Sequence, residues 1–407
     1  MELGPIFRAM MRHRPRFLLI VVEVALTLAI VANSVSLILE ARSEMTRPSG
    51  FDEENLIYVS STPFADAFKD PNYRRQSVDS DLRALRSLPG VKAASHTTVV
   101  PWSAATMSFG PRVAGTQKES PGSQVFFVDA AILETLGVGV ARGRGFTKEE
   151  YDANPAEQPL NEYEGPVLIT QTLADALFPD GDALGKVLEN ETGGGHFTII
   201  GIVDRFYKPA GTPEFSQSAT LFPIASASER SAGYLVRTET GKADAVAADV
   251  EKALLKADDG RNVRVRTIAE LRTRFHTEDR LLVAALNGVM VLLVLVTALG
   301  IVGLTSFSVA ERRRQIGTRR ALGATKAAIL RHFLIENWLV TTVGIALGLA
   351  LAYALNYGLI IWIEGTRLDW RVLAVGVAFL WTLGIASALG PALRAARVPP
   401  AIATRNV

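Results

Sequence analysis

Four long apolar windows constrain this chain most strongly, because each is long enough to cross a lipid bilayer as a helix. They span residues 17–39, 281–308, 333–357 and 372–389 of the 407-residue chain. A helix of about 20 apolar residues, rising roughly 1.5 Å per residue, crosses a hydrocarbon core about 30 Å thick. Charged residues are almost absent from the windows and frequent between them. We therefore predict an α-helical membrane protein with four transmembrane helices.

The largest segment between two windows, residues 40–280, has the mixed pattern of a large α/β domain outside the bilayer. Each of its ends is predicted to contain a strand, a helix and a second strand, with turn signals between them. These elements are expected at residues 55–60, 77–88, 91–100, 233–237, 242–256 and 262–268. Because the two units are similar in size, we predict that they form one split sheet, with halves at about 50–110 and 230–275.

The middle of this domain, about residues 112–225, is predicted to be an insertion that is richer in strands and turns. Runs of β-favouring residues indicate strands at 124–128, 167–170 and 197–203. Gly193-Gly194-Gly195 is typical of a hairpin turn, and a helix is expected at 173–178. The domain is therefore expected to be a split α/β sheet interrupted by a β-rich insertion.

The distribution of basic residues predicts which side of the membrane each segment occupies, because cytoplasmic segments carry an excess of Lys and Arg. The relevant residues are Arg8, Arg12, Arg14 and Arg16 before the first window, Arg312, Arg313, Arg314, Arg319, Arg320, Lys326 and Arg331 after the second, and Arg394, Arg397 and Arg405 after the fourth. The loop between the last two windows carries Arg367 and Arg371 beside Glu364 and Asp369. We therefore predict cytoplasmic termini and an outer location for residues 40–280.

The segments that flank the windows fit this topology. Residues 1–16 form a basic amphipathic segment, and the first window lacks a cleavage site, so we expect an uncleaved membrane helix. Trp362 and Trp370 flank the short outer loop, as tryptophan commonly does at membrane interfaces. Pro391 is expected to end the fourth helix, because proline lacks a backbone N–H donor, and residues 390–407 then form a cytoplasmic tail.

Two features inside the windows are candidates for contacts between helices. Glu23 places a carboxylate in the first window, where a charged group is costly and therefore marks either a functional site or a contact with a neighbouring helix or subunit. Gly344 and Gly348 form a Gly-x-x-x-Gly pattern in the third window, which allows two helix backbones to approach closely. Packing within one subunit is the simplest interpretation of the glycine pair.

The sequence shows no catalytic or metal-binding constellation. The chain has no cysteine, which excludes thiolate chemistry and thiolate metal sites. Its five histidines are far apart and lack the paired spacing of metal ligands. We therefore expect a protein that is not an enzyme, that holds no metal or cofactor of its own and that has no nucleic-acid partner.

The basic segment between the second and third windows, residues 309–332, carries the most specific pattern. Its core reads Glu311-Arg312-Arg313-Arg314-Gln315-Ile316-Gly317-Thr318-Arg319-Arg320-Ala321-Leu322-Gly323-Ala324. This stretch resembles the cytoplasmic signature of FtsX-like permeases of ABC transporters, with Gln315 in place of the usual glutamate. The tail from Gly390 to Ala401 resembles the ending that this family shows after its last helix.

The large domain resembles the periplasmic domain of MacB-type permeases. The resemblance is carried by Phe126-Phe127, Leu136-Gly137, Gly143-Arg144-Gly145-Phe146, residues 174–178, Leu184-Gly185-Lys186 and Ile200-Gly201-Ile202-Val203. It implies a porter-like α/β subdomain with a more β-rich insertion. MacB carries a fused ATPase that this chain lacks, so the resemblance implies that ATP and Mg bind to a separate ABC ATPase dimer.

The resemblance also implies a mechanism. Residues 311–324 would be the coupling segment on which the ATPase docks, and the second helix would carry its movement to the outer domain, which is called mechanotransmission. Two permeases would pair through their first two helices. A paralogous partner is favoured, because two Glu23 carboxylates would approach each other across a symmetric interface. The expected function is efflux at the inner membrane, with a periplasmic adaptor and an outer-membrane exit duct.

Three alternatives remain open from the sequence. A lipoprotein-extraction permease of the same superfamily would pull lipidated proteins from the membrane. A cell-division permease would activate cell-wall hydrolases by transmembrane signalling, although its outer domain is typically much smaller. A membrane-anchored sensor or scaffold would need neither an ATPase nor the basic segment. Each alternative predicts a different set of co-purifying proteins.

Overall fold

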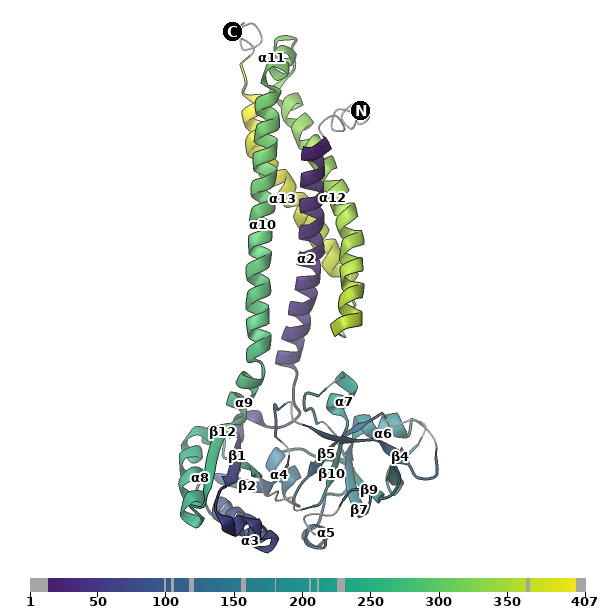
Figure 1. Ribbon diagram of the computed structural model, residues 1–407, viewed down its shortest axis with the longest axis vertical. Helices are drawn as coiled ribbons and strands as arrows, with labels where there is room; N and C mark the ends of the chain where they lie inside the picture. Colours follow the sequence, from purple (N-terminus) through teal and green to yellow (C-terminus); the bar gives the residue numbers. More distant parts are fainter. Residues whose placement is uncertain are drawn as a thin grey trace. The chain divides into compact units, whose positions relative to one another are not determined.

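The structure is a computed structural model that describes residues 14–98, 100–103, 106–116, 121–154, 159–179, 181–204, 206–210, 212–224, 231–363 and 367–399. It divides into two compact units, shown in Figure 1. The chain up to Thr46 and from Glu278 onwards forms the helical unit, and Arg47–Thr277 forms the α/β unit. The amphipathic segment up to residue 13, Glu364, the tail from residue 400 and the side chain of Trp362 lie outside the described part.

The helical unit contains, in the described part of the chain, four helices that are long and apolar enough to cross a membrane. They are α2 (Arg14–Thr46), α10 (Thr277–Glu311), α12 (Lys326–Ile363) and α13 (Trp370–Ala396). Each contains one of the apolar windows, which confirms the prediction of four such helices. The helices extend beyond the windows because backbone hydrogen bonding continues where water can solvate the polar side chains.

The prediction that Pro391 ends the last helix is wrong. Pro391 lies inside α13, which continues to Ala396. Proline removes the hydrogen bond that the carbonyl of Ser387 would otherwise accept, but this loss is tolerated where neighbouring helices pack around the site. Ala388, Ala392 and Ala395 are buried on both sides of the proline, so packing holds the helix together through this position.

Helices α2, α12 and α13 pack closely around small residues. A Cβ atom at Gly344 of α12 would lie 2.8 Å from the Cβ of Val24 in α2, and one at Gly348 would lie 3.0 Å from the carbonyl oxygen of Ala25. The distance at Gly344 is too short for a real side chain, and the one at Gly348 is tight enough that its neighbours would have to shift, so both glycines favour this approach of the two backbones. Asn337 of α12 donates a hydrogen bond of 2.9 Å to the carbonyl of Gly384 in α13.

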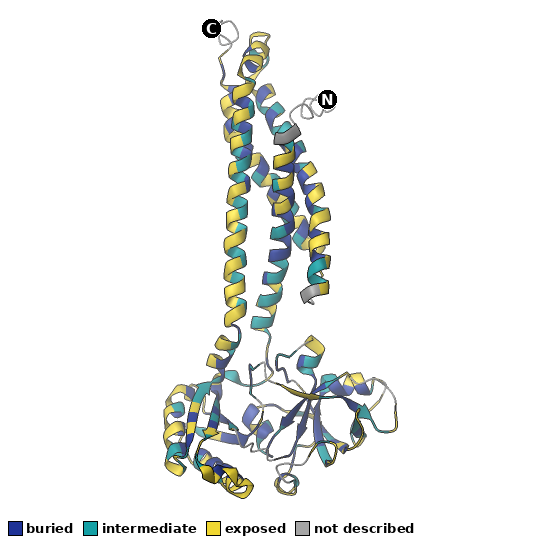
Figure 2. Cartoon of the chain, in the orientation of Figure 1, coloured by how far each residue is buried: buried dark blue, intermediate teal, exposed yellow. Residues whose placement is uncertain are grey.

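Helix α10 packs less closely than the other three. Its buried residues are Thr297, Ile301, Thr305 and Val309, which recur every four positions and form one narrow stripe. Its first half, residues 277–296, contains no buried residue, and large apolar side chains such as Leu292 are exposed there. Figure 2 shows this contrast between α10 and the more buried α2. A second apolar partner or lipid must therefore cover most of α10.

The α/β unit confirms the prediction of a split sheet. One four-stranded antiparallel sheet has the order β12-β1-β11-β2 and combines strands from both ends of the domain. The strands are β1 (Leu56–Pro63), β2 (Val91–His96), β11 (Ala232–Thr238) and β12 (Arg261–Thr267). Strand β2 ends at His96, earlier than predicted, so Thr97 and Thr98 belong to the connection that follows it.

Two helices pack on this sheet through apolar residues at helical spacing. Helix α3 (Pro71–Arg86) contributes Val78, Leu82 and Leu85, and helix α8 (Ala243–Ala257) contributes Val246, Val250 and Leu254. Helix α3 begins six residues before the predicted start at residue 77. The Asp70 side chain accepts a hydrogen bond from the backbone N–H of Asn72, and Pro71 occupies the first turn, so the true helix start has ordinary capping chemistry.

The insertion forms an eight-stranded sheet with the order β3-β5-β10-β7-β9-β8-β4, in which β6 also pairs with β9. The strands are β3 (Met107–Phe109), β4 (Pro111–Val113), β5 (Ser123–Phe127), β6 (Val140–Gly143), β7 (Glu164–Thr170), β8 (Val187–Asn190), β9 (His196–Val203) and β10 (Ala219–Phe222). Gly193, Gly194 and Gly195 all have positive φ and reverse the chain between β8 and β9, as predicted.

Four short helices lie in the insertion, and one follows the split sheet. They are α4 (Ile132–Leu136), α5 (Lys148–Asp152), α6 (Gln171–Leu177), α7 (Pro213–Gln217) and α9 (Ile268–Phe275). Helix α6 contains most of the predicted helix at 173–178. Helix α9 is not among the predicted elements; it connects β12 to the start of α10 at Thr277.

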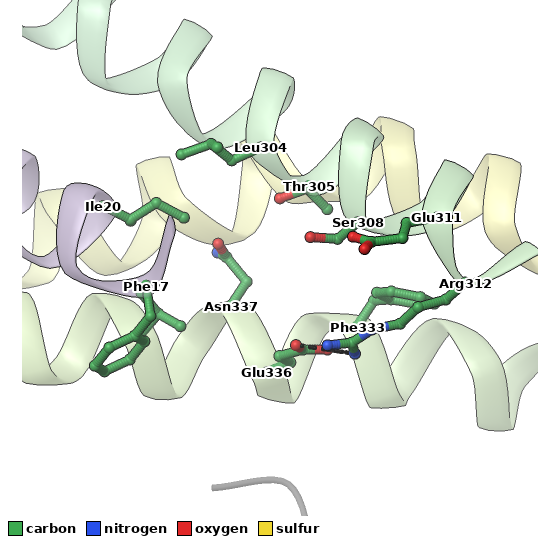
Figure 3. Close-up of a pocket in the computed structure, with 11 residues that line it drawn as sticks. Phe17, Ile20, Leu304, Thr305, Ser308, Glu311, Arg312, Phe333, Glu336 and Asn337 are labelled. Carbon is green, nitrogen blue, oxygen red and sulfur yellow. Dashed lines mark hydrogen bonds and ion pairs between the residues drawn. The ribbon is translucent and has the colours of Figure 1, made fainter. Parts of the chain in front are cut away.

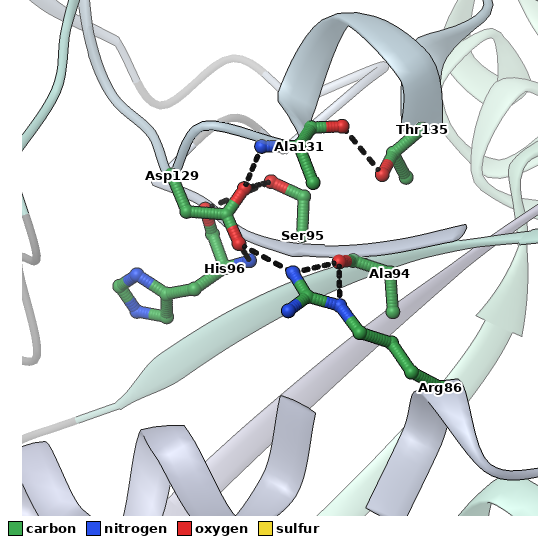
Figure 4. A network of polar contacts seen from close by, with 7 residues as sticks. All are labelled: Arg86, Ala94, Ser95, His96, Asp129, Ala131 and Thr135. Atoms are coloured by element: carbon green, nitrogen blue, oxygen red, sulfur yellow. Dashed lines mark hydrogen bonds and ion pairs between the residues drawn. The ribbon is translucent and has the colours of Figure 1, made fainter. Parts of the chain in front are cut away.

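The two sheets share one hydrophobic core and are further joined by a polar network. The shared core contains Leu56 and Leu235 of the split sheet together with Phe126 and Leu221 of the insertion. Figure 4 shows the polar network, in which the carboxylate of Asp129 accepts hydrogen bonds from Ser95 (2.5 Å) and Arg86 (3.0 Å). The insertion therefore belongs to the same packed body as the split sheet.

Candidate coupling site

The predicted coupling segment folds as a short helix between two long ones. Helix α11 (Arg313–Ala321) follows the end of α10 directly, and α12 begins at Lys326. Gly323 has a φ of 95°, a left-handed conformation that glycine adopts without strain, and it terminates α11. The hydroxyl of Thr325 accepts a hydrogen bond of 3.1 Å from the N–H of Ala328 and so caps the next helix.

One face of α11 is buried against the ends of three long helices. Ile316 and Gly317 are buried, and Ile316 belongs to an apolar cluster that we call the coupling-helix core. The core contains Val309, Ile316, Ile329, Phe333, Ala392, Ala395 and Val398. Most of these residues lie in α10, α11, α12 or α13, and Val398 lies just after the end of α13. Helix α11 therefore shares one packed apolar core with the ends of α10, α12 and α13.

Two arginines of the segment bind within the chain. Nη1 of Arg312 lies 3.1 Å from both carboxylate oxygens of Glu336 in α12 (Figure 3). Nη1 of Arg320 donates to the carbonyls of Ala396 (3.2 Å) and Val398 (2.7 Å) at the carboxyl end of α13. A cation is favoured at this end of a helix, because its last carbonyls lack intrahelical partners. Both contacts tie the coupling segment to the helical unit.

The opposite face of the segment is exposed. Arg313, Arg314, Gln315, Arg319 and Ala321 are all exposed, and Ala324 is half-buried against the coupling-helix core. Leu322, which lies outside the apolar windows, is 83% exposed. We call Arg314, Arg319 and Leu322 the outward face, because they lie away from the side that carries Ile316 and Gly317. It combines the positive charge of the arginines with the apolar side chain of Leu322, and these side chains are exposed in the described part of the chain.

A cavity of about 70 Å³ lies beside the Arg312–Glu336 pair, between α2, α10 and α12. Figure 3 shows Thr305, Ser308 and Glu311 of α10 on one side of it and Asn337 of α12 on the other. Phe17 and Ile20 of α2 complete its wall. The ion pair therefore joins α10 and α12 beside the cavity, next to the apolar contacts of Val309 and Phe333 in the coupling-helix core.

The remaining predicted residues contact neighbours within the same chain. The carboxylate of Glu23 lies against Gly300 of α10, where a Cβ atom would come within 2.5 Å of it. One turn further along α2, the hydroxyls of Thr27 and Thr297 are 2.8 Å apart. The argument for a paralogous partner assumed that Glu23 faces a second copy across a symmetric interface. Because Glu23 faces α10 of its own chain, that argument loses its basis.

Some contacts of the site lie outside what the sequence predicts. The sequence indicates the arginines but neither the partner of Arg312 nor the contact of Arg320 with α13. For Arg312 the sequence does contain a clue to its partner. Glu336 places a carboxylate near the start of the third apolar window, where a charge is costly unless it is paired. No local signal indicates the backbone carbonyls of α13 as partners of Arg320.

Comparison with known proteins identifies the family. Residues 17–253 match the family described as MacB-like periplasmic core domain, and residues 287–400 match FtsX-like permease C-terminal. The chain is a permease of the MacB and FtsX family. This confirms the resemblance that the basic segment and the large domain carry in the sequence.

Several curated proteins are similar to this MacB/FtsX-family permease. The uncharacterized ABC transporter permease YknZ of Bacillus subtilis is 24% identical over 346 residues, which cover 82% of this chain and 81% of YknZ. The macrolide export ATP-binding/permease protein MacB of Azoarcus sp. is 27% identical over 339 residues, covering 80% of this chain. The match covers 47% of that MacB, so the chain spans under half the length of this larger relative.

Among solved structures, the periplasmic region of MacB from Actinobacillus actinomycetemcomitans matches 57% of this chain and 98% of its own length. The sequence identity is 12% and the TM-score is 0.37. The family assignment therefore rests on the sequence matches.

Proposed function

We propose that this chain is the permease subunit of an ABC transporter and that ATP and Mg bind to a separate ABC ATPase dimer. The relatives named MacB are described as combined ATP-binding and permease proteins, and the matches with this chain cover under half of two of them. YknZ, a permease of similar length, is matched over most of its chain. The match with YknZ, which is described as an ABC transporter permease, supports the assignment of this chain as the permease subunit.

The observation that carries this proposal is the two-faced arrangement of α11. Its buried face contacts the ends of the long helices through the coupling-helix core, whereas its outward face presents arginines and Leu322. Docking of Leu322 into an apolar groove of the ATPase would bury surface that is now in contact with water. Closure of the ATPase dimer would then push α11 and, through it, α10, α12 and α13.

Helix α10 is the element suited to carry this movement to the α/β unit. It packs through one stripe of residues spaced four apart, and it continues directly into α9 of the α/β unit. The cavity beside the Arg312–Glu336 pair leaves room for α10 to shift against α12. In this mechanism, which is mechanotransmission, the substrate need not pass between the four helices.

A second permease, identical or paralogous, would cover the exposed apolar surface of α10. We place the protein in the inner membrane, with both termini in the cytoplasm and the α/β unit in the periplasm, on the basis of the arginine distribution. We favour efflux with a periplasmic adaptor and an outer-membrane exit duct. Lipoprotein extraction and activation of wall hydrolases are the competing outcomes.

The test uses the outward face, because its side chains are exposed in the part of the chain that the structure describes. We expect the double variant Arg319→Glu, Leu322→Asp to insert normally but to lose stimulated ATP hydrolysis by the co-purified ATPase by at least tenfold. Replacement of buried Gly317 by leucine should have the same effect by displacing α11. Arg320 is a poorer test position, because it also binds the end of α13.

The matched control is Arg367→Glu. Arg367 is exposed and lies in the loop between α12 and α13, which the topology places on the opposite side of the membrane. It should leave ATP turnover unchanged. Unchanged turnover in the Arg319→Glu, Leu322→Asp variant would contradict the docking site, and purification from the native host without any ATPase would contradict the transporter proposal itself.

A further inference from the structure

Three separate segments of the α/β unit meet at Arg272 of helix α9. Its Nη2 donates a hydrogen bond of 2.9 Å to the carbonyl oxygen of Arg47, and its Nη1 lies 2.9 Å from Oε2 of Glu53. The guanidinium carbon also lies over the indole ring of Trp102, 4.4 Å from the ring centroid. Arg272 thus joins the start of the unit, the connection after β2 and the helix that precedes α10.

Trp102 is held in an unusual conformation by its surroundings. Its φ is +54°, and no other non-glycine residue in the described part of the chain has a positive φ. A bulky residue adopts this conformation only where the surrounding structure enforces it. Trp102 is 4% exposed, and its ring packs against Tyr207, Phe275 and His276 at centroid distances of 6.2, 6.0 and 5.2 Å.

The residue after Trp102 is fixed by a buried lysine. Nζ of Lys208 donates a hydrogen bond of 3.0 Å to the carbonyl oxygen of Ser103, and Lys208 is 2% exposed. A buried ammonium group is costly and is retained only where its hydrogen bonds hold the structure in place. The strained tryptophan and the buried lysine show that the position of this connection is specified by several independent contacts.

The places of these segments in the chain give the cluster a role. Arg47 is the first residue after α2, and α9 ends two residues before α10 begins. Trp102 lies in the connection that leads from the split sheet into the insertion. The chain therefore enters the α/β unit at Arg47 and leaves it after α9, and the cluster connects both places to the loop around Trp102 that leads into the insertion.

We propose that Arg272, Trp102 and Glu53 form a clasp that makes α9 and the segment after α2 move with the insertion as one body. This inference rests on the proposed function, because it assigns the point at which movement of α10 enters the α/β unit. Arg272 is a positioning residue in this scheme: it touches no substrate and acts by fixing α9.

The chemistry of the clasp requires arginine. A guanidinium group is planar, stacks on an aromatic face and directs several N–H donors in fixed directions, whereas a lysine ammonium group offers a single point charge. Arg272→Lys should therefore open the clasp while keeping the positive charge beside Glu53. Arg274 lies two residues further along α9 and is exposed, so Arg274→Ala is a control with the same residue type in the same helix.

The first measurement is hydrogen exchange of the full-length chain, read by mass spectrometry. Arg272→Ala and Arg272→Lys should raise exchange at least threefold in residues 47–53 and 100–103, whereas Arg274→Ala should not. Trp102→Phe, which retains an aromatic face for the guanidinium, should have little effect. If hydrogen exchange in residues 47–53 and 100–103 is unchanged in the Arg272 variants, Arg272 does not hold these segments and the clasp is overturned. This result does not depend on the function of the protein.

The second measurement uses the permease purified with its ATPase in lipid nanodiscs and compares the nucleotide-free complex with the complex trapped by ATP and vanadate. In the wild type, exchange should change both in residues 311–324 and in the α/β unit. In Arg272→Lys, ATP hydrolysis and the change in 311–324 should persist while the change in the α/β unit is lost. A merely structural role would not separate the two responses.

The outcomes distinguish this inference from the proposal beneath it. If residues 311–324 do not respond to ATP and vanadate in the wild type, the coupling function is wrong and the role of the clasp falls with it. If they respond and the α/β unit of Arg272→Lys still responds fully, the coupling function stands and the clasp is overturned. Arg272→Lys decides the question even if Arg272→Ala fails to fold.

Discussion

At the scale of single residues, His96 shows how burial without a partner sets a pH dependence. Its side chain is fully buried in β2, and neither ring nitrogen has a hydrogen-bond partner among the described residues. In Figure 4 the ring points away from the Asp129 carboxylate, and His96 donates to that carboxylate through its backbone N–H. Burial disfavours the charged imidazolium and lowers the pKa of His96 from 6.5 to about 4.

This pKa predicts that the α/β unit loses stability as the pH falls. Between pH 6.5 and about 4 the unfolded chain binds a proton at His96 that the folded chain does not, so the free energy of unfolding decreases through this range. The contribution of this group is roughly 3 kcal/mol. His96→Phe should make the pH dependence of urea unfolding shallower by about that amount, measured on the full-length chain through the exchange protection of β2.

The control for this prediction is His196→Phe. The His196 side chain is 59% exposed, at the start of β9, so its removal should leave the slope of the wild type unchanged. If the free energy of unfolding depends on pH as steeply in His96→Phe as in the wild type, His96 does not contribute to this dependence and the prediction is wrong.

At the scale of elements, the packing of the helical unit depends on two glycines, which have no side chain. Gly344 and Gly348 place the backbone of α12 against α2, and this contact lies within one chain. The glycines therefore organise the subunit itself. Polar contacts such as the hydrogen bond from Asn33 of α2 to the carbonyl of Ala352 in α12, at 3.1 Å, add to the same pair of helices.

A larger side chain at Gly344 should separate these two helices. In Gly344→Ile, the new Cβ would lie 2.8 Å from the Cβ of Val24, so α2 or α12 must shift. We expect a destabilisation of about 1–3 kcal/mol, the range for overpacking a well-packed contact, and a lower thermal unfolding temperature in detergent. Gly358→Ile is the matched control in the same helix, because no atom lies within 4 Å of a Cβ at that position. Equal unfolding temperatures for the two variants would contradict the packing role.

At the scale of the whole molecule, α10 is incomplete in a single chain. Its first half contains no buried residue, and Leu292 and Leu299 are 61% and 69% exposed. Lipid can cover such a surface, but in the proposed coupling mechanism α10 needs a partner against which it moves. We therefore expect a second permease on this face of α10.

Site-specific photo-crosslinking tests this expectation. A photo-reactive benzoylphenylalanine in place of Leu292 should form an adduct with the mass of a second permease in native membranes, identified by mass spectrometry. The same group in place of Val375 of α13, which is also 69% exposed, should form far less. Adducts of equal yield at both positions, or adducts with lipid alone, would contradict a dimer that forms through α10.

The sequence by itself determined the features that depend on local pattern. Apolar length specifies the four helices, because a bilayer of given thickness accepts only runs of a certain length. Strand and turn patterns specify most of the split sheet, and the residues from Glu311 to Ala324 are enough to indicate the family. Where prediction relied on one residue rather than a pattern, as with Pro391, packing around the helix overrode the local preference.

The tertiary structure decided which residues meet. Arg312 meets Glu336, and Arg320 meets the carbonyls of Ala396 and Val398 at the carboxyl end of α13. Arg272 meets Trp102 and Glu53, although 170 or more positions separate it from either partner in the chain. Such contacts depend on the register and rotation of packed elements, which the spacing of residue types along one segment does not encode. The residue types of the candidate coupling segment were therefore visible in the sequence, whereas their contacts with the rest of the molecule were not.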